Sequence, residues 1–348
     1  MNILYGVSGE GLGHAFRAIS VAKYLEAKGH KILIITYGQA YPIFKDKFSI
    51  IRVNGLHVMY HNGEAKNTKT ILFNIKNFSK NISKIDEIIN RVNNFNPDLC
   101  ITDMEPFSSY ISHFYKLPLI SLSNQNLFLC CHFNLQNKFI KDYLIAKSII
   151  KAITPTADYY ITLSLDNMKL KNKNCYLVSP IIRQEILRIK PKSKKYVVVY
   201  LSRENQSVLN LLKKVKESFI VYGYNINKKE ANLQFKKKEH FIKDFINCKA
   251  IISTSGFTSI SEAIYLKKPY LALPLKGQFE QVFNAIYLKR KEFGDYSNKL
   301  TLKQLNTFLK NINYYKDNLN KFQGNLKSVY PVLDEILDKI QSTRNINN

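Results

Sequence analysis

One stretch, residues 249–285, constrains the fold of this chain more than any other. It predicts a buried strand at Ala250–Ile252, a turn of small residues at Ser253–Thr258, a helix that carries Glu262 in its first turns, and a second apolar strand at Tyr270–Pro274. Strands that alternate with helices in this way form parallel sheets with helices on their faces. The stretch therefore predicts part of a doubly wound α/β domain.

The polar groups of this stretch suit a nucleotide sugar. Backbone amides at a helix start have no partner inside the helix and attract phosphate. The Glu262 carboxylate can accept hydrogen bonds from a ribose, and the polar loop after the second strand can do the same for sugar hydroxyls. The candidate donor-binding residues here are Ser255, Gly256, Phe257, Thr258, Glu262, Gln278, Glu280 and Gln281.

The same stretch resembles the nucleotide-binding half of glycosyltransferases with two Rossmann-like domains, the GT-B architecture. The most similar branch contains the peptidoglycan N-acetylglucosaminyltransferase and is family 28-like. Its pattern is a strand, Ser/Thr-Gly-small-Thr, Glu-Ala, Lys-Pro, an apolar strand, Pro, a polar loop and Asn-Ala. This chain has nearly every element, with Phe257 where a small residue is commoner. The alternative is an ordinary βαβ unit that ends in a polar loop.

The resemblance implies two doubly wound domains that face each other across a cleft. At 348 residues the chain also exceeds what one hydrophobic core usually organises. We expect an acceptor-binding domain at 1–183, a nucleotide-sugar-binding domain at 184–325, and a last helix at 326–348 that crosses back to the first domain. A long amphipathic basic helix is predicted at Lys69–Asn93, and helical structure at Leu302–Ile340.

Cysteine usage and hydropathy favour a cytoplasmic protein. The five cysteines form no C-x-x-C pair and are odd in number, which argues against a disulfide framework and against a structural zinc site. The sequence opens as a strand, lacks the apolar core of a signal peptide, and contains no run of 18 apolar residues. A soluble or peripheral protein is therefore expected.

The net charge of +26, from 52 basic and 26 acidic residues, has two open explanations. The lysines are scattered in a chain rich in Lys, Asn and Ile, as an AT-rich coding sequence would produce. Alternatively, they contact anionic lipid at the inner face of the cell membrane, where each lysine contributes about 1 kcal/mol. Nucleic acid is the less favoured partner, because the sequence has no nucleic-acid-binding motif.

A glycine-rich loop follows the first predicted strand and leads into Gly13, His14 and Arg17. It lacks the G-x-G-x-x-G spacing of a dinucleotide site, and no acidic residue ends the second strand, which argues against a dehydrogenase. In the GT-B branch the corresponding Gly-His loop closes over sugar and acceptor, so the resemblance implies an acid/base or donor-orienting role for His14. The alternative is a histidine that only caps the helix.

A catalytic histidine needs an orienting carboxylate, and Asp103 ends the fourth predicted strand at the carboxyl edge of the sheet. Related GT-B enzymes carry an Asp at a corresponding location. Glu105 is the rival for this role or for the base itself, and Glu10 is a weaker third candidate. Asp103 could instead be a helix N-cap. Asp103-Met-Glu105 could also mimic a metal-binding D-x-D motif, but no metal is expected, because that motif belongs to a different glycosyltransferase architecture.

Further donor-binding candidates match the family by location. Ser179–Arg183 resembles the family's Asn-Pro-Val-Arg with one residue inserted, so Arg183 is expected to face the donor diphosphate. The loop at Leu201–Asn205 replaces a Gly-Gly-Ser-rich loop. Packing or surface solvation would explain each of these positions equally. The additional candidates are Arg183, Ser202, Arg203, Phe241 and Ile242.

The resemblance implies an inverting, metal-independent transfer of a sugar from a UDP-sugar, which is the donor substrate, to a hydroxyl of a cell-surface glycan or glycolipid, with no cofactor. Two alternatives stay open. One is an isomerase on the same architecture, similar to UDP-N-acetylglucosamine 2-epimerase. The other is a non-catalytic basic protein that binds membrane or nucleic acid.

Overall fold

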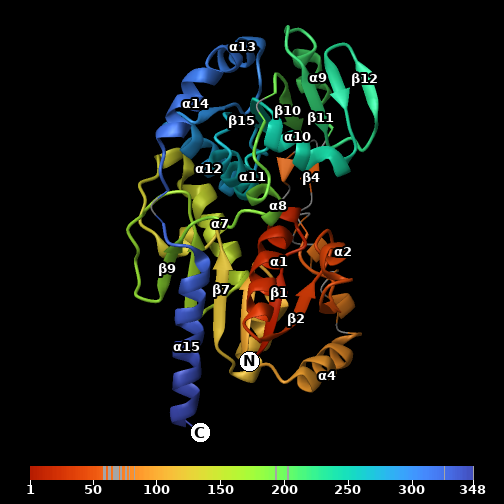
Figure 1. The fold of residues 1–348 in the computed structure, drawn as a ribbon. Coiled ribbons are helices and arrows are strands. Elements are labelled where there is room, and N and C mark those ends of the chain that lie inside the picture. Colours follow the sequence, from red (N-terminus) through yellow and green to blue (C-terminus); the bar gives the residue numbers. More distant parts are fainter. Residues whose placement is uncertain are drawn as a thin grey trace. The chain divides into compact units, whose positions relative to one another are not determined.

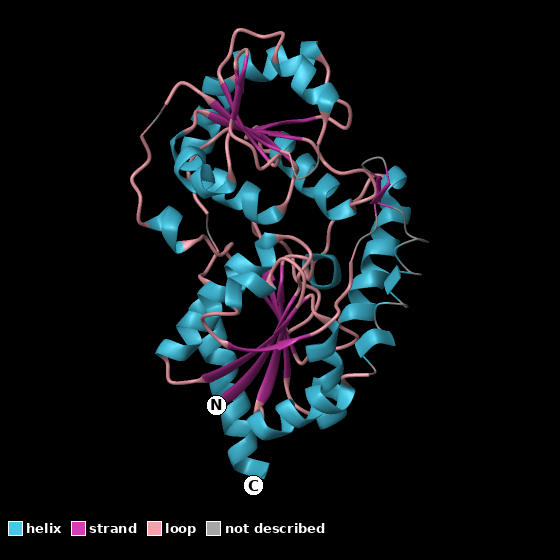
Figure 2. Cartoon of the chain, turned by 90° about the vertical axis from the view of Figure 1, so that its right-hand side faces the viewer, coloured by secondary structure: helices cyan, strands magenta, loops and turns pink. Residues whose placement is uncertain are grey.

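The computed structural model describes residues 1–57, 60–61, 64–65, 70, 73–74, 77, 79–81, 83–192, 194–201, 204–324 and 326–347. It divides into two compact units. Unit 1 comprises Met1–His61, Lys66–Ile181 and Gly324–Asn348, and unit 2 comprises Asn62–Ala65 and Ile182–Gln323. In each unit helices cover both faces of one sheet (Figure 2).

Unit 1 is built on a parallel sheet of seven strands in the order β3-β2-β1-β6-β7-β8-β9. The central strands β6 and β7 are mostly apolar and are buried along their whole length, as expected for a sheet with helices on both faces. The strands are β1 (Asn2–Val7), β2 (Lys31–Thr36), β3 (Ser49–Arg52), β6 (Leu99–Asp103), β7 (Leu119–Ser123), β8 (Tyr159–Leu163) and β9 (Cys175–Val178).

The helices of unit 1 connect these strands as the alternating pattern predicts. The helix that follows the glycine-rich loop, α1, begins at Leu12 and so includes His14 in its first turn. The helices are α1 (Leu12–Ala27), α2 (Tyr41–Phe44), α4 (Ile85–Phe95), α5 (Pro106–Tyr115), α6 (Leu127–Cys130), η1 (Asn137–Phe139) and α7 (Ile140–Ile153). Much of the helix predicted at Lys69–Asn93 lies outside the described residues, and only its last part coincides with α4.

The last helix, α15 (Val329–Asn347), belongs to unit 1 and packs against β8 and β9 (Figure 1). Polar contacts hold it: Tyr24 donates a hydrogen bond to Asp334 at 2.6 Å, and Arg344 forms an ion pair with Asp98 at 2.5 Å. The predicted helical segment Leu302–Ile340 is in fact three helices, because α13 (Leu302–Lys310), α14 (Ile312–Lys321) and α15 are separate.

Unit 2 contains a second sheet of seven strands in the order β12-β13-β11-β10-β14-β15-β16. All neighbouring strands in this sheet are parallel except β12 and β13, which form an antiparallel pair at one edge. The sequence did not predict this pair. The strands are β10 (Val197–Tyr200), β11 (Phe219–Tyr222), β12 (Lys228–Glu230), β13 (Leu233–Phe235), β14 (Ala250–Ser253), β15 (Tyr270–Ala272) and β16 (Gly294–Tyr296).

The helices of unit 2, besides α13 and α14, are α8 (Gln184–Leu187), α9 (Gln206–Leu212), η2 (Lys238–His240), α10 (Phe241–Asn247), α11 (Phe257–Tyr265) and α12 (Phe279–Arg290). Two short strands, β4 (Tyr60–His61) and β5 (Glu64–Ala65), complete the described elements. The two sheets confirm the predicted class, which is doubly wound α/β with two Rossmann-like domains.

Candidate active site

The carboxyl ends of β1 and β6 meet where the strand order of the first sheet reverses. Val7 pairs with Asp103 in register, and the amide of Ser8 donates a hydrogen bond to the Asp103 carbonyl oxygen at 3.0 Å. The chain leaves β1 towards β2 on one side, whereas β6 lies on the other. Open α/β sheets bind ligands in the space between loops that diverge in this way. The start of α1 and the end of β6 lie at this point of unit 1.

His14 and Asp103, both predicted from the sequence, contact each other at this edge. Nδ1 of His14 lies 2.8 Å from Oδ1 of Asp103. The His14 side chain is 13% exposed, whereas Asp103 is fully buried. A carboxylate only accepts hydrogen bonds, so it favours the imidazole tautomer with the proton on Nδ1. That tautomer has its lone pair on Nε2, where it can accept a proton from a ligand. Gly13, the other candidate of this turn, is half-buried beside His14.

Arg17 is part of the same cluster, although sequence reasoning assigned it no role. Its Nε and Nη2 donate to the two carboxylate oxygens of Asp103, each at 2.5 Å, and its Nη1 donates to Oδ1 of Asn124 at 2.7 Å. Nη2 also lies 2.8 Å from Nδ1 of His14. Because a guanidinium only donates, this contact is not a hydrogen bond in the tautomer that has its proton on Nδ1, and Nη2 and Nδ1 then both donate to Oδ1 of Asp103. Arg17 lies three residues after His14, and residues at this spacing share one face of a helix. The spacing could therefore have placed Arg17 beside His14 from the sequence alone.

The charges around Asp103 keep it ionised. Burial by itself raises the pKa of a carboxyl group, but the charges and hydrogen bonds of Arg17 and His14 outweigh burial and hold the pKa of Asp103 below its usual value. The result is a buried carboxylate that orients an imidazole, the arrangement of a general base.

Glu105 does not contact His14 but caps α5. Its carboxylate accepts hydrogen bonds from the amides of Phe107 at 3.0 Å and Ser108 at 2.7 Å. Gly6 of β1 makes room for this cap, because a Cβ there would lie 1.9 Å from Oγ of Ser108. The N-cap role that the sequence suggested for Asp103 is therefore filled by Glu105. Burial raises the pKa of Glu105 to about 7, although the hydrogen bonds from Ser108 and Phe107 oppose the shift.

Replacing Glu105 by glutamine is expected to remove part of the pH dependence of stability. Between pH 4.5 and pH 7 the unfolded chain releases the proton that folded Glu105 keeps, so the wild type loses about 3 kcal/mol of unfolding free energy as the pH rises through this window. Glu105→Gln has no such group. Urea denaturation of both proteins at pH 5 and pH 8 measures the difference, and parallel behaviour of the two would contradict the raised pKa.

Glu10, the weaker carboxylate candidate, pairs with a different histidine. Its Oε1 lies 2.8 Å from Nδ1 of His57, and both side chains are about one-third exposed, at 34% for Glu10 and 31% for His57. His57 follows β3, a position that no motif had singled out. The first sheet thus carries a second histidine–carboxylate pair at its carboxyl edge.

In unit 2 the predicted phosphate-binding turn leads from β14 into α11. Gly256 is the N-cap and offers no side chain to the first amides of the helix. A Cβ at Gly256 would meet no atom within 4 Å, so the space in front of the helix start is open. Oγ of Ser255 is buried, and no described residue forms a hydrogen bond with it. Open amides and a spare hydroxyl at the positive end of a helix suit a phosphate group. Phe257 is buried and Thr258 half-buried in the first turn of the helix.

Arg183 and Glu262, predicted to contact different parts of a donor, form a buried ion pair with each other. Nε of Arg183 donates to Oε1 of Glu262 at 2.6 Å, and Nη2 donates to Oε2. Glu262 is fully buried and Arg183 is 9% exposed. Burial raises the pKa of Glu262, although the charge of Arg183 opposes the shift. The separate ribose and diphosphate contacts of these two side chains remain predictions.

Hydrogen bonds of the Gln281 side chain hold the polar loop before α12. Oε1 of Gln281 accepts a hydrogen bond from the amide of Leu275 at 3.0 Å, and its Nε2 donates to Gln278. Glu280 is half-buried in the first turn of α12. Nδ2 of Asn284, also in α12, donates to the carbonyl oxygen of Ser255 at 3.1 Å and so links this helix to the phosphate-binding turn.

Of the remaining candidates, Phe241 packs in an aromatic cluster at the carboxyl end of β10 and β11. Its ring centroid lies 5.4 Å from that of Tyr200 and 5.2 Å from that of Tyr222. Ile242 is half-buried at the start of α10. Ser202 and Arg203 lie outside the described residues, so their predicted phosphate contacts stay untested.

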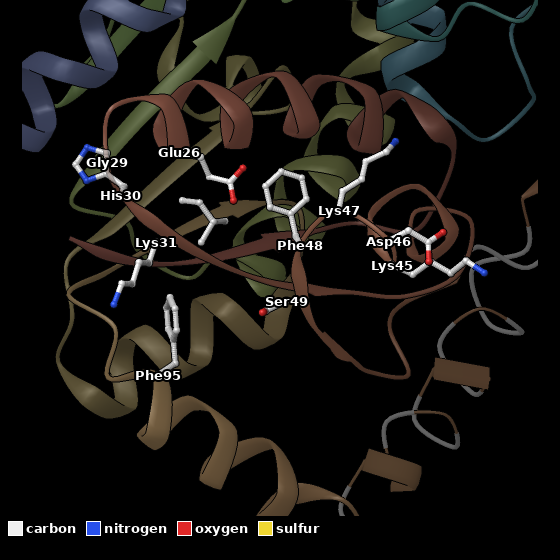
Figure 3. A pocket seen from close by; sticks show the side chains of 11 residues that line it. Glu26, Gly29, His30, Lys31, Lys45, Asp46, Lys47, Phe48, Ser49 and Phe95 are labelled. Carbon is white, nitrogen blue, oxygen red and sulfur yellow. The ribbon is translucent and has the colours of Figure 1, made fainter.

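A hollow of about 810 Å³ lies away from these clusters, at the amino ends of β2 and β3 (Figure 3). Its lining mixes basic, acidic and apolar side chains, among them Lys31, Lys47, Asp46 and Phe48, and includes none of the candidate residues. Within the described part of the chain, no three His, Cys, Asp or Glu side chains are grouped so that they could hold a metal ion. Nor is any described helix both long enough and apolar enough to cross a bilayer.

Known proteins identify the family. The model of a family described as Glycosyl transferase family 1 matches residues 1–313. No curated protein sequence matches the chain. The solved structures that share its fold include a glycotransferase of kitacinnamycin, with a TM-score of 0.66, 10% identity, and coverage of 92% of this chain and 93% of that one.

Two further solved structures extend the fold match over nearly the whole chain. The glycosyltransferase VinC in complex with DTDP has a TM-score of 0.62 and 14% identity, and covers 98% of this chain and 100% of its own. MurG of Acinetobacter baumannii has a TM-score of 0.58 and 15% identity, with coverage of 98% and 99%. These structures confirm the GT-B fold class, and the family match covers both units. The chain belongs to glycosyl transferase family 1 and is a glycosyltransferase.

Proposed function

We propose that the protein is an inverting, metal-independent glycosyltransferase that moves a sugar from a UDP-sugar to a hydroxyl group of a cell-surface glycan or glycolipid. We further propose that it belongs with the branch that contains the peptidoglycan N-acetylglucosaminyltransferase. The residue pattern at 249–285 supports this finer placement, since it combines Ser255-Gly256, Glu262-Ala263 and Asn284-Ala285 at the spacings of that branch.

The observation that carries the donor assignment is the start of α11, which no side chain caps, beside the buried hydroxyl of Ser255, which has no hydrogen-bond partner among the described residues. A leaving nucleoside diphosphate develops negative charge, and amides fixed at a helix start stabilise that charge without reorganising. Arg183 in the same unit adds to this stabilisation if its guanidinium, which is paired with Glu262, turns to the diphosphate when the donor binds. Because the helix-start amides already supply positive potential, the proposed transfer needs no metal ion.

The proposed base is Nε2 of His14. An acceptor hydroxyl attacks the anomeric carbon and forms the new C–O bond, while its proton passes to Nε2. The bond between the anomeric carbon and the diphosphate oxygen breaks, and its electron pair leaves with UDP. Asp103 stabilises the imidazolium that results, as a carboxylate bound to Nδ1 does in other general-base pairs. One displacement from the face opposite the leaving group inverts the anomeric centre.

Binding of UDP is expected to raise the melting temperature of the full-length protein in a concentration-dependent manner, because ligands that bind only the folded state stabilise it. UDP, TDP and free uridine at equal concentration separate recognition of the base from recognition of the diphosphate. Ser255→Ala should weaken UDP binding by about threefold to tenfold, since it deletes one phosphate hydrogen bond. Ser261→Ala is the matched control, because Oγ of Ser261 bonds to the carbonyl of Phe257 within the same helix. Absence of any stabilisation by nucleoside diphosphates would refute the proposed function.

We also propose peripheral contact with an anionic membrane, through α7. Ile140, Leu144 and Ile149 of this helix are 43%, 52% and 50% exposed, and three lysines, at 141, 147 and 151, lie on the same helix. Apolar side chains with flanking lysines are typical of helices that lie in a membrane interface. We expect the protein to sediment with anionic vesicles and not with neutral vesicles, which a vesicle sedimentation assay measures.

A further inference from the structure

The pair formed by Glu10 and His57 is the strongest feature of unit 1 that the proposed mechanism does not use. Glu10 lies four residues before His14, on the loop that leads from β1 into α1. One residue of each histidine–carboxylate pair therefore lies in the short stretch from the end of β1 to the first turn of α1. A side chain one-third exposed at the carboxyl edge of an open α/β sheet is available to a ligand, and ligands of such sheets bind at this edge.

The loops after β1, β2 and β3 pack against one another around Tyr37, which belongs to the loop after β2. Its ring is 2% exposed and its hydroxyl lies 3.1 Å from Oγ of Ser8. A Cβ at Gly9 would lie 2.2 Å from the carbonyl oxygen of Tyr37, and one at Gly55 would lie 2.0 Å from its ring. Only glycine fits at either position, because the backbones of Gly9 and Gly55 lie directly against Tyr37. Glu10 follows Gly9 in the first of these loops, and His57 lies two residues after Gly55 in the third.

His57 itself is held on several sides. Its amide donates to Oδ1 of Asn74 at 2.8 Å, and its carbonyl oxygen accepts from Nδ2 of Asn74 at 2.9 Å. Its ring meets the rings of Tyr37 and Phe73 edge to face, with centroids 5.5 Å and 6.0 Å away. With Nδ1 directed to Glu10, the ring presents Nε2, for which no described residue is a hydrogen-bond partner. Carboxylates that hold Nδ1 in this way fix the orientation and tautomer of a histidine for work at Nε2.

We propose that His57, positioned by Glu10, is an acceptor-binding residue that donates or accepts a hydrogen bond at a hydroxyl group of a sugar-containing acceptor, whose ring packs against Phe73. Phe73 is 39% exposed beside His57 and offers an apolar surface next to a fixed polar group, the combination that small-molecule sites use for affinity and orientation. The inference rests on the proposed function, because it names the substrate that the pair recognises. Glu10 acts through His57 and is a positioning residue.

The test uses the full-length protein with isotope-labelled histidine and octyl β-glucoside, below its micelle concentration, as a hydroxyl-bearing probe. We expect the ring signals of His57 to shift on titration, while those of His30, at the opposite edge of the sheet (Figure 3), do not. His57→Gln keeps an amide nitrogen near the position of Nε2 and should bind within about threefold of the wild type. His57→Asn places its amide near Nδ1 and should bind about tenfold more weakly, because the hydrogen bond to the probe is lost.

Glu10→Gln is expected to weaken binding less than His57→Asn, because an amide oxygen can still accept from Nδ1. Silent His57 signals in the wild type, or equal affinity of His57→Asn and His57→Gln, would overturn the inference. The melting-temperature shift with UDP is measured on the same samples. If UDP stabilises the wild type and His57 stays silent, only this inference fails. If UDP gives no shift, the proposed donor site fails, whatever His57 does. Should a variant not fold, the wild-type titration still decides.

Discussion

Replacing His14 by alanine is expected to lower the rate of sugar transfer by about 10²- to 10⁴-fold, the usual contribution of a positioned general base, while UDP stabilises the variant as it does the wild type. The expectation follows from the position of the imidazole, whose Nδ1 lies 2.8 Å from the buried carboxylate of Asp103. The donor-binding turn lies in unit 2, on different elements, so the loss should fall on the rate of transfer and not on nucleotide affinity.

Two further variants sharpen this experiment. Asp103→Asn should also lose most of the activity, because a side-chain amide can donate to Nδ1 and so favours the wrong tautomer. His132→Ala, an exposed histidine in the same unit, is the matched control and should keep full activity. Full activity of His14→Ala would remove His14 from the mechanism. Loss of UDP binding in His14→Ala would instead assign the residue to the donor site.

The elements that the sequence predicts well are those with a strong and local signal. Apolar runs bounded by turns located the parallel strands β14 and β15, which begin at the predicted residues Ala250 and Tyr270. The edge hairpin of β12 and β13 was missed, because β12 (Lys-Lys-Glu) contains no apolar residue and β13 (Leu-Gln-Phe) is only three residues long. The breaks between α13, α14 and α15 were also missed, since the helical pattern continues on both sides of each short break.

The candidate site was predictable where topology decides which residues meet. Asp103 could be placed near His14 because Asp103 ends β6 and His14 follows β1, the parallel neighbour of β6, at the same sheet edge. The choice between Asp103 and Glu105 was not decidable from sequence, since it depends on which carboxylate caps α5. The bidentate contact of Arg17 with Asp103 and the pairing of His57 with Glu10 join residues 86 and 47 positions apart, and no local pattern reports such contacts.

Replacing Arg183 by methionine is expected to destabilise unit 2 by about 3–5 kcal/mol, the usual cost of leaving a buried charge without its partner. The charge left behind is that of Glu262, which is fully buried in α11. Because burial already raises the pKa of Glu262, protonation can relieve the penalty, so Arg183→Met should be less destabilised at pH 5 than at pH 8. Chemical denaturation at the two pH values measures this difference.

The double variant Arg183→Met/Glu262→Leu separates stability from function. Replacing both partners of a buried ion pair by apolar side chains is often neutral, so its free energy of unfolding should return to within about 1 kcal/mol of the wild type. If Glu262 binds the ribose and Arg183 the diphosphate, this stable protein should nevertheless lose the melting-temperature shift with UDP. A double variant that is stable and binds UDP normally would make the pair a purely structural one. A double variant as unstable as Arg183→Met would show that the unpaired carboxylate is not the source of the penalty.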